Sequence, residues 1–288
     1  MALGDILQFV FSGIMIGAIY SLIAVGLCIV YNTSEVINFA QGEFAMIGGM
    51  VAAVMLREWG LSLPVVILIC LAVSTAIGIV CERLTITPLK NPTILRLIII
   101  TLGLGISLKA GVMMVWGKFS LTIPSFTEGP PVSLWGATIV RQAFWIVGFA
   151  VIMMAGMRIF FERTLTGKAM RAVAEDAVAA SLLGIPKKAM VMLAFALSSF
   201  IGALAGIVIT PVSLTSFDHG TSLGLKGFCA AILGGMGNIY GSFFGGIILG
   251  VLESVGAGMV SSAYKESFAF LILLLILFLK PEGLFGKK

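Results

Sequence analysis

Apolar residues fill most of the chain, in runs close to the length of a membrane-spanning helix. The clearest runs cover residues 6–30, 63–80, 94–116, 137–160, 189–210 and 267–279. A helix needs about 20 apolar residues to cross the hydrocarbon core of a bilayer, where it satisfies its own backbone hydrogen bonds. The pattern therefore predicts an all-α integral membrane protein, a polytopic helical bundle of about 8–10 transmembrane segments.

One long polar interval interrupts these runs, at residues 161–188. Residues 169–183 are mostly Ala, Leu and Val with scattered charges, and Ala and Leu are strong helix formers. Gly184 supplies a C-terminal stop, and Pro186 follows it, as is common after helices. We expect one exposed helix between two membrane-embedded halves, and we interpret it as a surface offered to a soluble partner.

Polar residues also occur inside an apolar segment near the N-terminus. Asn38, Gln41 and Glu43 lie in what would otherwise be a second span that ends near Leu56. Polar side chains at membrane depth are costly unless they face the bundle interior or a wet cavity. We interpret them as part of a translocation path, together with Thr101 in the fourth span. The alternative is an interfacial turn, with the membrane helix beginning later.

A second apolar segment, residues 224–254, is interrupted by glycines. The part before Met236 is too short for a comfortable span, so we expect a short or re-entrant half-helix followed by a full helix. Interrupted helices tend to mark substrate paths in transporters. Asn238, at the interruption, and Glu253, an acid inside the following helix, therefore join the predicted path.

Glycines spaced four residues apart predict close helix packing, because they share one helix face. Two such sets occur, Gly13 with Gly17, and Gly237 with Gly241 and Gly245. For the first set the alternative is that glycine is simply tolerated in a membrane helix.

Composition agrees with a membrane protein. Of 288 residues, 59% are hydrophobic and 11% are charged, whereas soluble domains carry about 25% charged residues. The net charge of +5 does not indicate nucleic-acid binding, because the basic residues gather within residues 83–96, 158–188 and 280–288. The positive-inside rule places these segments and the C-terminus in the cytoplasm. We expect about nine crossings, an external N-terminus and a single transmembrane domain over residues 1–288.

Catalytic and cofactor chemistry has no recognisable pattern in the chain. It contains no GxxxxGK[ST], GxSxG or HExxH motif, one histidine, and four cysteines that lie in or at the ends of apolar runs. We therefore expect no enzymatic activity, no metal site and no cofactor in this chain. Active transport would need an ion gradient or the ATPase activity of another subunit.

Four stretches resemble the permease subunits of branched-chain amino acid ABC importers. They are an AVGL run at residues 24–27 with NFAQGE at 38–43 and MIGG at 46–49, GKAMRAVAEDAVAASLLGI at 167–185, LGGMGNIYGSFFGGIILG at 233–250, and the ending KPEGLFG at 280–286. The order of these motifs is preserved along most of the chain. Gln41 departs from the His that is common at its position.

The resemblance implies an all-helical fold of the ABC importer permease type and a role for residues 161–188 in coupling to an ATPase. The positions it assigns to coupling are Gly167, Arg171, Ala172, Ala180, Gly184 and Ile185, to which we add the acids Glu175 and Asp176. It also implies partners: a second related permease, two cytoplasmic ATPase subunits that bind the ATP, and an external, periplasmic substrate-binding protein. The expected location is the bacterial inner membrane.

The ligand is predicted to be leucine, isoleucine or valine, although the resemblance also admits urea, short amides and aromatic acids. The resemblance admits either a different chain or another copy as the second permease. A different class is a gradient-driven secondary transporter, which would use Glu43, Lys109 and Glu253 as a charge relay. Lys109, within the fourth span, either extends its ammonium to the interface or pairs with an interior acid.

Overall fold

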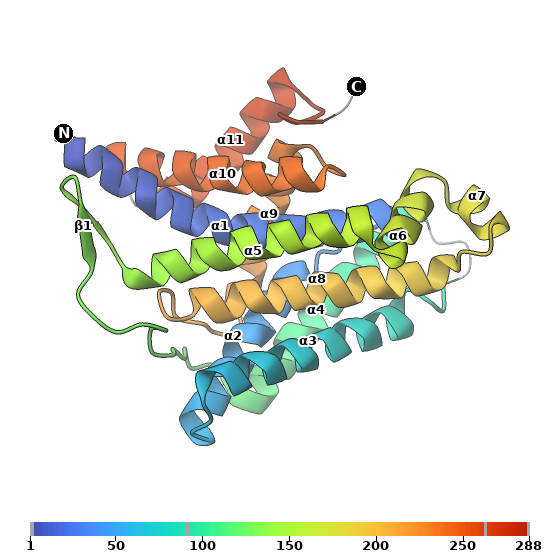
Figure 1. The fold of residues 1–288 in the computed structure, drawn as a ribbon, viewed down its shortest axis with the longest axis horizontal. Helices are drawn as coiled ribbons and strands as arrows, with labels where there is room; N and C mark the ends of the chain where they lie inside the picture. Colours follow the sequence, from blue (N-terminus) through green and yellow to red (C-terminus); the bar gives the residue numbers. More distant parts are fainter. Residues whose placement is uncertain (1–2, 90–92, 262–263, 287–288) are drawn as a thin grey trace.

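The computed structural model describes residues 3–89, 93–261 and 264–286, and this part of the chain is mainly helical (Figure 1). Lys90, Lys287 and Lys288 lie outside it. The elements in chain order are α1 (Leu3–Ser34), α2 (Gln41–Glu58), α3 (Leu63–Thr85), α4 (Ile94–Trp116), β1 (Val132–Leu134), β2 (Ala137–Ile139), α5 (Arg141–Arg163), α6 (Leu165–Glu175), α7 (Ala177–Leu182), α8 (Lys187–Ile209), α9 (His219–Gly234), α10 (Ile239–Met259) and α11 (Lys265–Leu279).

Within the described residues, six helices are long and apolar enough to cross a membrane: α1, α3, α4, α5, α8 and α10. Helices α2, α9 and α11 are shorter, with 18, 16 and 15 residues, and they pack among the six long helices. The predicted half-helix and full helix around residue 236 correspond to α9 and α10. The predicted polytopic all-α fold is confirmed.

Helix α1 is the centre of the bundle, and α10 packs antiparallel along it (Figure 1). A Cβ atom on Gly13 would lie 2.6 Å from the Cα of Val251, and one on Gly17 would lie 2.8 Å from the Gly246 carbonyl oxygen. Because neither position has room for a side chain, the contact between these two backbones depends on glycine.

The glycines of the second predicted set do not share one helix face. Gly241 and Gly245 lie in α10 against the carbonyl oxygens of Gly234 and Ala230 in α9. Gly237, however, precedes α10 and has a φ of +97°. The prediction of a continuous helical stripe from Gly237 is therefore wrong, because the chain turns there before the helix begins.

Helices α3, α4, α5 and α11 present large apolar side chains outward. In α4 the buried residues are only Leu97, Thr101 and Val112, while Ile106 and Met114 are exposed. Apolar surface of this extent on a membrane protein faces lipid or another membrane subunit.

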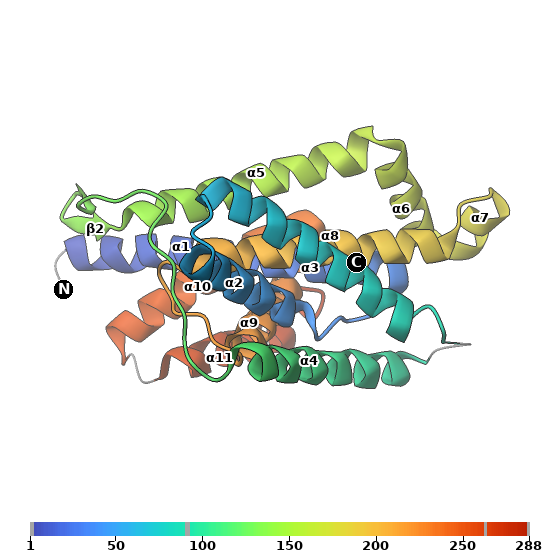
Figure 2. The ribbon, with the colours of Figure 1, turned by 90° about the horizontal axis from the view of Figure 1, so that it is seen from below.

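The two ends of the bundle differ in structure (Figure 2). One end carries the N-terminus and the hairpin of β1 and β2, in which Val132 pairs with Ile139. Gln8 of α1 holds this hairpin by donating to the Thr138 carbonyl oxygen at 2.9 Å and accepting from its N–H at 2.6 Å. The other end carries α6, α7, the last turn of α3 and the first turn of α4.

The prediction of one continuous exposed helix over residues 169–183 is wrong. This segment is divided into α6 and α7 at Asp176, whose backbone is extended (φ −151°, ψ 103°). The Asp176 carboxylate accepts the N–H groups of Val178 and Ala179 at 2.8 and 3.0 Å, so this residue caps a new helix instead of continuing the old one. Gly184, with a φ of +83°, ends α7 as predicted.

Three predicted boundaries shift. Helix α1 extends to Ser34, and α5 begins only at Arg141 because residues 137–139 form a strand. Helix α9 begins at His219, before the apolar segment that starts at residue 224. The sequence pattern did not reveal the hairpin, since its strands are only three residues long.

Candidate functional site

The chain breaks between α1 and α2, and the start of α2 lies buried inside the bundle. Glu35 leaves α1 with a positive φ of 58°, and helical structure resumes only at Gln41. Asn38, fully buried, accepts the Ala40 N–H at 3.1 Å through its side-chain oxygen. Its Nδ2 atom has no hydrogen-bond partner within the described residues. The break is therefore enclosed by the other helices of the bundle.

Gln41 joins the start of α2 to the middle of α8. Its Nε2 donates to the Ser198 carbonyl oxygen at 3.0 Å, and the Ser198 hydroxyl donates back to Gln41 Oε1. Both side chains are buried. The reciprocal pair satisfies two polar groups that would otherwise be costly at this depth.

Glu43 joins the start of α2 to the start of α9. Its Oε1 accepts from the Thr221 hydroxyl at 2.9 Å, and Gly42 and Gly220 bring the two backbones together. The side chain is only 4% exposed, yet Oε2 has no hydrogen-bond partner in the described structure. Glu43 is thus a buried acid with one free oxygen at a helix junction.

Helix α4 reaches the same region through Thr101, which is fully buried and donates to the Ile37 carbonyl oxygen at 3.2 Å. Four of the six predicted path residues, Asn38, Gln41, Glu43 and Thr101, are therefore gathered around the start of α2. Lys109, two turns further along α4, makes no ion pair within the described residues. Its Nζ lies 5.4 Å from the ring centre of Phe217, as an ammonium over an aromatic face.

The other two predicted path residues lie elsewhere. Asn238 caps α10 by accepting the Gly241 N–H at 3.0 Å, and its Nδ2 donates to the Phe285 carbonyl oxygen at 2.9 Å. It therefore holds the C-terminal segment against the junction of α9 and α10. Asn238 thus has a structural role and follows the C-terminal end of α9, whereas Glu43 contacts Thr221 at the N-terminal end of that helix.

Glu253 is paired with a lysine that sequence reasoning overlooked. Lys226, in the middle of α9 and 5% exposed, donates to Glu253 at 2.8 Å and to Glu266 of α11 at 2.8 Å. The Tyr20 ring of α1 lies 5.6 Å from the same ammonium. The signal was available, because Lys226 is a charged residue inside a glycine-interrupted apolar segment.

The predicted coupling residues lie on α6, α7 and the turn after them. Gly167 packs against the backbone of Phe160, and Ala180 is buried, whereas Arg171, Glu175 and Asp176 are exposed. Four large apolar side chains of this region are also exposed by 70% or more: Leu165, Val178, Leu182 and Leu183. Exposed apolar side chains beside charges are typical of a protein-binding surface.

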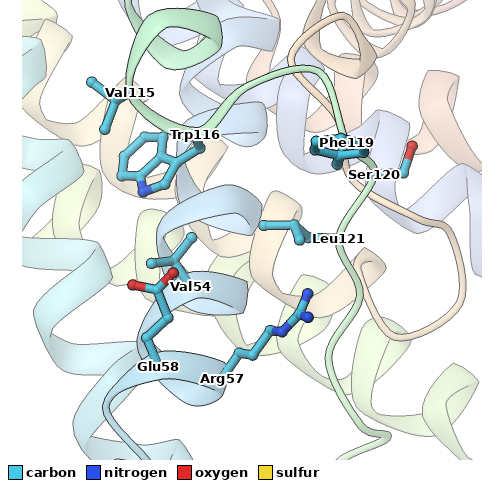
Figure 3. A pocket seen from close by; sticks show the side chains of 8 residues that line it. All are labelled: Val54, Arg57, Glu58, Val115, Trp116, Phe119, Ser120 and Leu121. Atoms are coloured by element: carbon cyan, nitrogen blue, oxygen red, sulfur yellow. The ribbon is translucent and has the colours of Figure 1, made fainter.

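A hollow of about 640 Å³ opens at the opposite end, between the last turns of α2 and α4 (Figure 3). Trp116 lies on its α4 side, the Glu58 carboxylate lies beside Val54, and Arg57 extends toward Leu121. None of the predicted path residues lines this hollow. The charged and hydroxyl side chains that line it, Arg57, Glu58 and Ser120, are all exposed.

The segment between α8 and α9 is fixed to the loop after α4. Leu121 and Thr215 form a backbone bridge, with nitrogen-to-oxygen distances of 2.8 and 2.9 Å. Beside it, the Ser216 hydroxyl donates to Asp218 at 2.6 Å, which lowers the pKa of that carboxyl below its ordinary value. Asp218 thus stays ionised at this end of the bundle.

These features define a multi-pass membrane protein with broken helices and an exposed helical loop. The family model for the permease component of branched-chain amino acid transport systems matches residues 9–277. The chain therefore belongs to this permease family, as its motifs predict.

Individual relatives agree. The chain is 34% identical to the high-affinity branched-chain amino acid transport system permease protein BraD of Pseudomonas aeruginosa and 33% identical to LivH of Escherichia coli K12. Each comparison covers 98% of this chain and 96% of the relative. The autoinducer 2 import system permease protein LsrC of Escherichia coli is 30% identical over 89% of this chain and 74% of its own length. Among solved structures, PsaBC from Streptococcus pneumoniae in complex with Fab has a similar fold, with a TM-score of 0.50, 13% identity, and coverage of 96% of this chain and 93% of that one.

Proposed function

We propose that this chain is the transmembrane permease subunit of an ATP-binding-cassette importer that moves leucine, isoleucine and valine across the inner membrane. The observation that carries the proposal is its similarity to BraD and LivH over nearly the whole of each chain. The names of these two relatives refer to branched-chain amino acid transport, and we take the substrate class from them. The C-terminus and the loop of α6 and α7 then face the cytoplasm, as the basic residues near them favour.

The partners follow from the same proposal. ATP is bound by two separate ATPase subunits, since this chain carries no phosphate-binding motif. A second permease, a copy or a related chain, completes the membrane part, and a periplasmic binding protein delivers the amino acid. The exposed apolar and charged side chains of α6 and α7 offer the ATPase a contact surface.

The loop is built to pass movement to the bundle. Thr164 both ends α5 and caps α6, accepting the Gly167 N–H at 3.0 Å. At the far side α7 is followed by α8 after four residues. A displacement of α6 and α7 by the ATPase would therefore act directly on α5 and α8.

From α8 a continuous set of contacts reaches the break before α2. Ser198 of α8 holds Gln41, and two residues later Glu43 holds Thr221 of α9. Movement of α8 would thus shift the buried start of α2. It would also strain the bond between Glu43 and Thr221, which among the described hydrogen bonds is the only one from this carboxylate to α9. We propose that opening at this junction admits the amino acid.

The gradient-driven alternative has less support. Its relay would need exchangeable partners for Glu43, Lys109 and Glu253, but Glu253 is already neutralised by Lys226. Lys109 lies against Phe217.

Energy dependence separates the two functions. We expect cells that express the complete transporter to retain leucine uptake when an uncoupler collapses the proton gradient, and to lose it when ATP is drained. The tagged chain should also recover an ATPase in a mild-detergent pull-down. Uptake that follows the gradient, by the chain alone in vesicles, would overturn the proposal.

A further inference from the structure

A second cavity lies on the face of α9 that points away from Glu43. Its volume is about 320 Å³, within the range of small-molecule sites. His219, Ser222, Leu223 and Lys226 line it from α9, at the i, i+3, i+4 and i+7 spacing of one helix face. The opposite face of α9, with Gly220 and Gly224, packs on α2.

The cavity has an apolar side and a charged side. The apolar side comes from Met15 and Ile16 of α1, from Ile209 and Val212 at the end of α8, and from Leu223. The charged side comes from Lys226 and from Lys265 and Glu266 at the start of α11. An apolar cavity with a few convergent polar groups is the usual form of a ligand site.

Glu253 holds the Lys226 ammonium in place through their ion pair. Because Glu253 is only 1% exposed, its carboxylate requires a positively charged partner. The second bond of the ammonium goes to Oε1 of Glu266. An ammonium has three N–H donors, so one remains for a ligand. Glu266 uses Oε1 for Lys226, and its side chain is 64% exposed, which leaves Oε2 for a ligand as well.

The charges around the cavity cancel. Lys226 and Lys265 are positive, while Glu266 and the supporting Glu253 are negative. A ligand with a net charge would leave one of these groups uncompensated, whereas a zwitterion would find a partner for each of its ends.

We propose that this cavity binds a free α-amino acid with an aliphatic side chain, the transported substrate. The α-ammonium group is placed on Glu266, the α-carboxylate on Lys226 and Lys265, and the side chain against Ile16, Ile209 and Leu223. The choice of an aliphatic amino acid as the ligand rests on the proposed function. The cavity would then give the permease a recognition step of its own, after release from the binding protein.

Occupation of the cavity has a route to the break before α2. Thr221, which holds Glu43, is the neighbour of Ser222, which lines the cavity. A ligand that draws α9 toward α11 would therefore pull on the bond between Thr221 and Glu43.

The test uses the complete transporter in nanodiscs without nucleotide and without binding protein. Its thermal stability is followed during titration with leucine, with 4-methylpentanoate, which lacks the ammonium group, and with 3-methylbutylamine, which lacks the carboxylate. We expect leucine to stabilise the wild type, and each singly charged probe to bind about tenfold or more weakly, because one charged hydrogen-bonded group is lost.

Variants locate the site. Glu266→Gln and the cavity-filling Leu223→Trp should each weaken leucine binding about tenfold or more. Glu58→Gln is the matched control, since it removes one carboxylate from the hollow between α2 and α4 (Figure 3). Unchanged binding in both cavity variants, or an equal loss in Glu58→Gln, would overturn the proposal. Glu266 is exposed, so its variant tests the site even if Leu223→Trp fails to assemble.

A phospholipid headgroup with an ammonium and a phosphate carries the same charges. The titration is therefore repeated in nanodiscs of phosphatidylglycerol alone and with added phosphatidylethanolamine. Phosphatidylethanolamine retained by the wild type and lost in Glu266→Gln, with no leucine binding in either lipid, would assign the cavity to lipid and overturn our proposal. ATP-driven leucine uptake with the binding protein is measured in parallel. Uptake without binding in the cavity refutes only this inference, whereas absence of uptake refutes the proposed function.

Discussion

Gln41 and Ser198 exchange two hydrogen bonds across the buried contact between α2 and α8. The start of α2 is thereby fixed to the helix that directly follows the polar loop. We expect Ser198→Ala to destabilise the protein by about 1–3 kcal/mol, because it removes the hydroxyl partner of Gln41 Oε1 in a buried site. Unfolding in detergent measures the change. In a double-mutant cycle, Gln41→Leu with Ser198→Ala should cost less than the sum of the two single changes. Additive effects would show that the pair is not coupled.

Lys226 and Glu253 should behave as one unit. Lys226→Met leaves the Glu253 carboxylate buried without its ion-pair partner, and we expect a loss of about 3–5 kcal/mol. Adding Glu253→Gln removes the stranded charge, so the double variant should recover a large part of the stability. Thermal unfolding of the two variants tests this, and a double variant as unstable as Lys226→Met would contradict the ion-pair explanation.

The contact between α1 and α10 should not tolerate a side chain at Gly17. The backbone of Gly246 and Ile247 lies where a Cβ would be placed, so Gly17→Val should destabilise the bundle by about 1–3 kcal/mol or more through overpacking. Gly148→Val is the control, because Gly148 of α5 has open space at that position. Equal yields and melting temperatures for both variants would argue against close glycine packing.

Asp176 should matter for coupling because it caps α7. Asp176→Ala removes the acceptor for two backbone N–H groups and should weaken α7 by about 1 kcal/mol. Asp176→Asn keeps an acceptor and serves as the control. We expect the ratio of leucine transported to ATP hydrolysed to fall in Asp176→Ala and to be preserved in Asp176→Asn. A fall in both would assign the effect to the charge and not to the cap.

Glu43 should influence transport through its charge. Glu43→Gln retains a side-chain oxygen for the Thr221 hydroxyl but removes the negative charge of this buried side chain. We expect the maximal uptake rate to fall about tenfold or more with little change in stability. Uptake kinetics and a melting curve measured on the same preparation check this. A wild-type rate would remove Glu43 from the path.

Local patterns accounted for much of the fold and for part of the site. The length of the apolar runs predicted the long helices, and the polar residues Asn38, Gln41 and Glu43 indicated the segment in which α2 begins. Lys226 is a visible charge in an apolar segment, but its neighbouring residues do not indicate that Glu253 and Glu266, 27 and 40 residues away, would be its partners. The division of the polar loop at Asp176 was missed for a related reason. An acid in an Ala-rich run is compatible with one helix or two, and only the capping geometry decides.

The sequence by itself determined that this protein crosses a membrane with helices, that it carries one long polar loop, and to which permease family it belongs. Those properties depend on hydrophobicity and motif order, which are local along the chain. Only the tertiary structure decided which polar groups meet: Asn38, Gln41, Glu43 and Thr101 around the start of α2, and Lys226 with two acids beside a separate cavity. These groupings depend on how glycine contacts set the positions of α1, α2, α9 and α10, and such contacts join residues far apart in sequence.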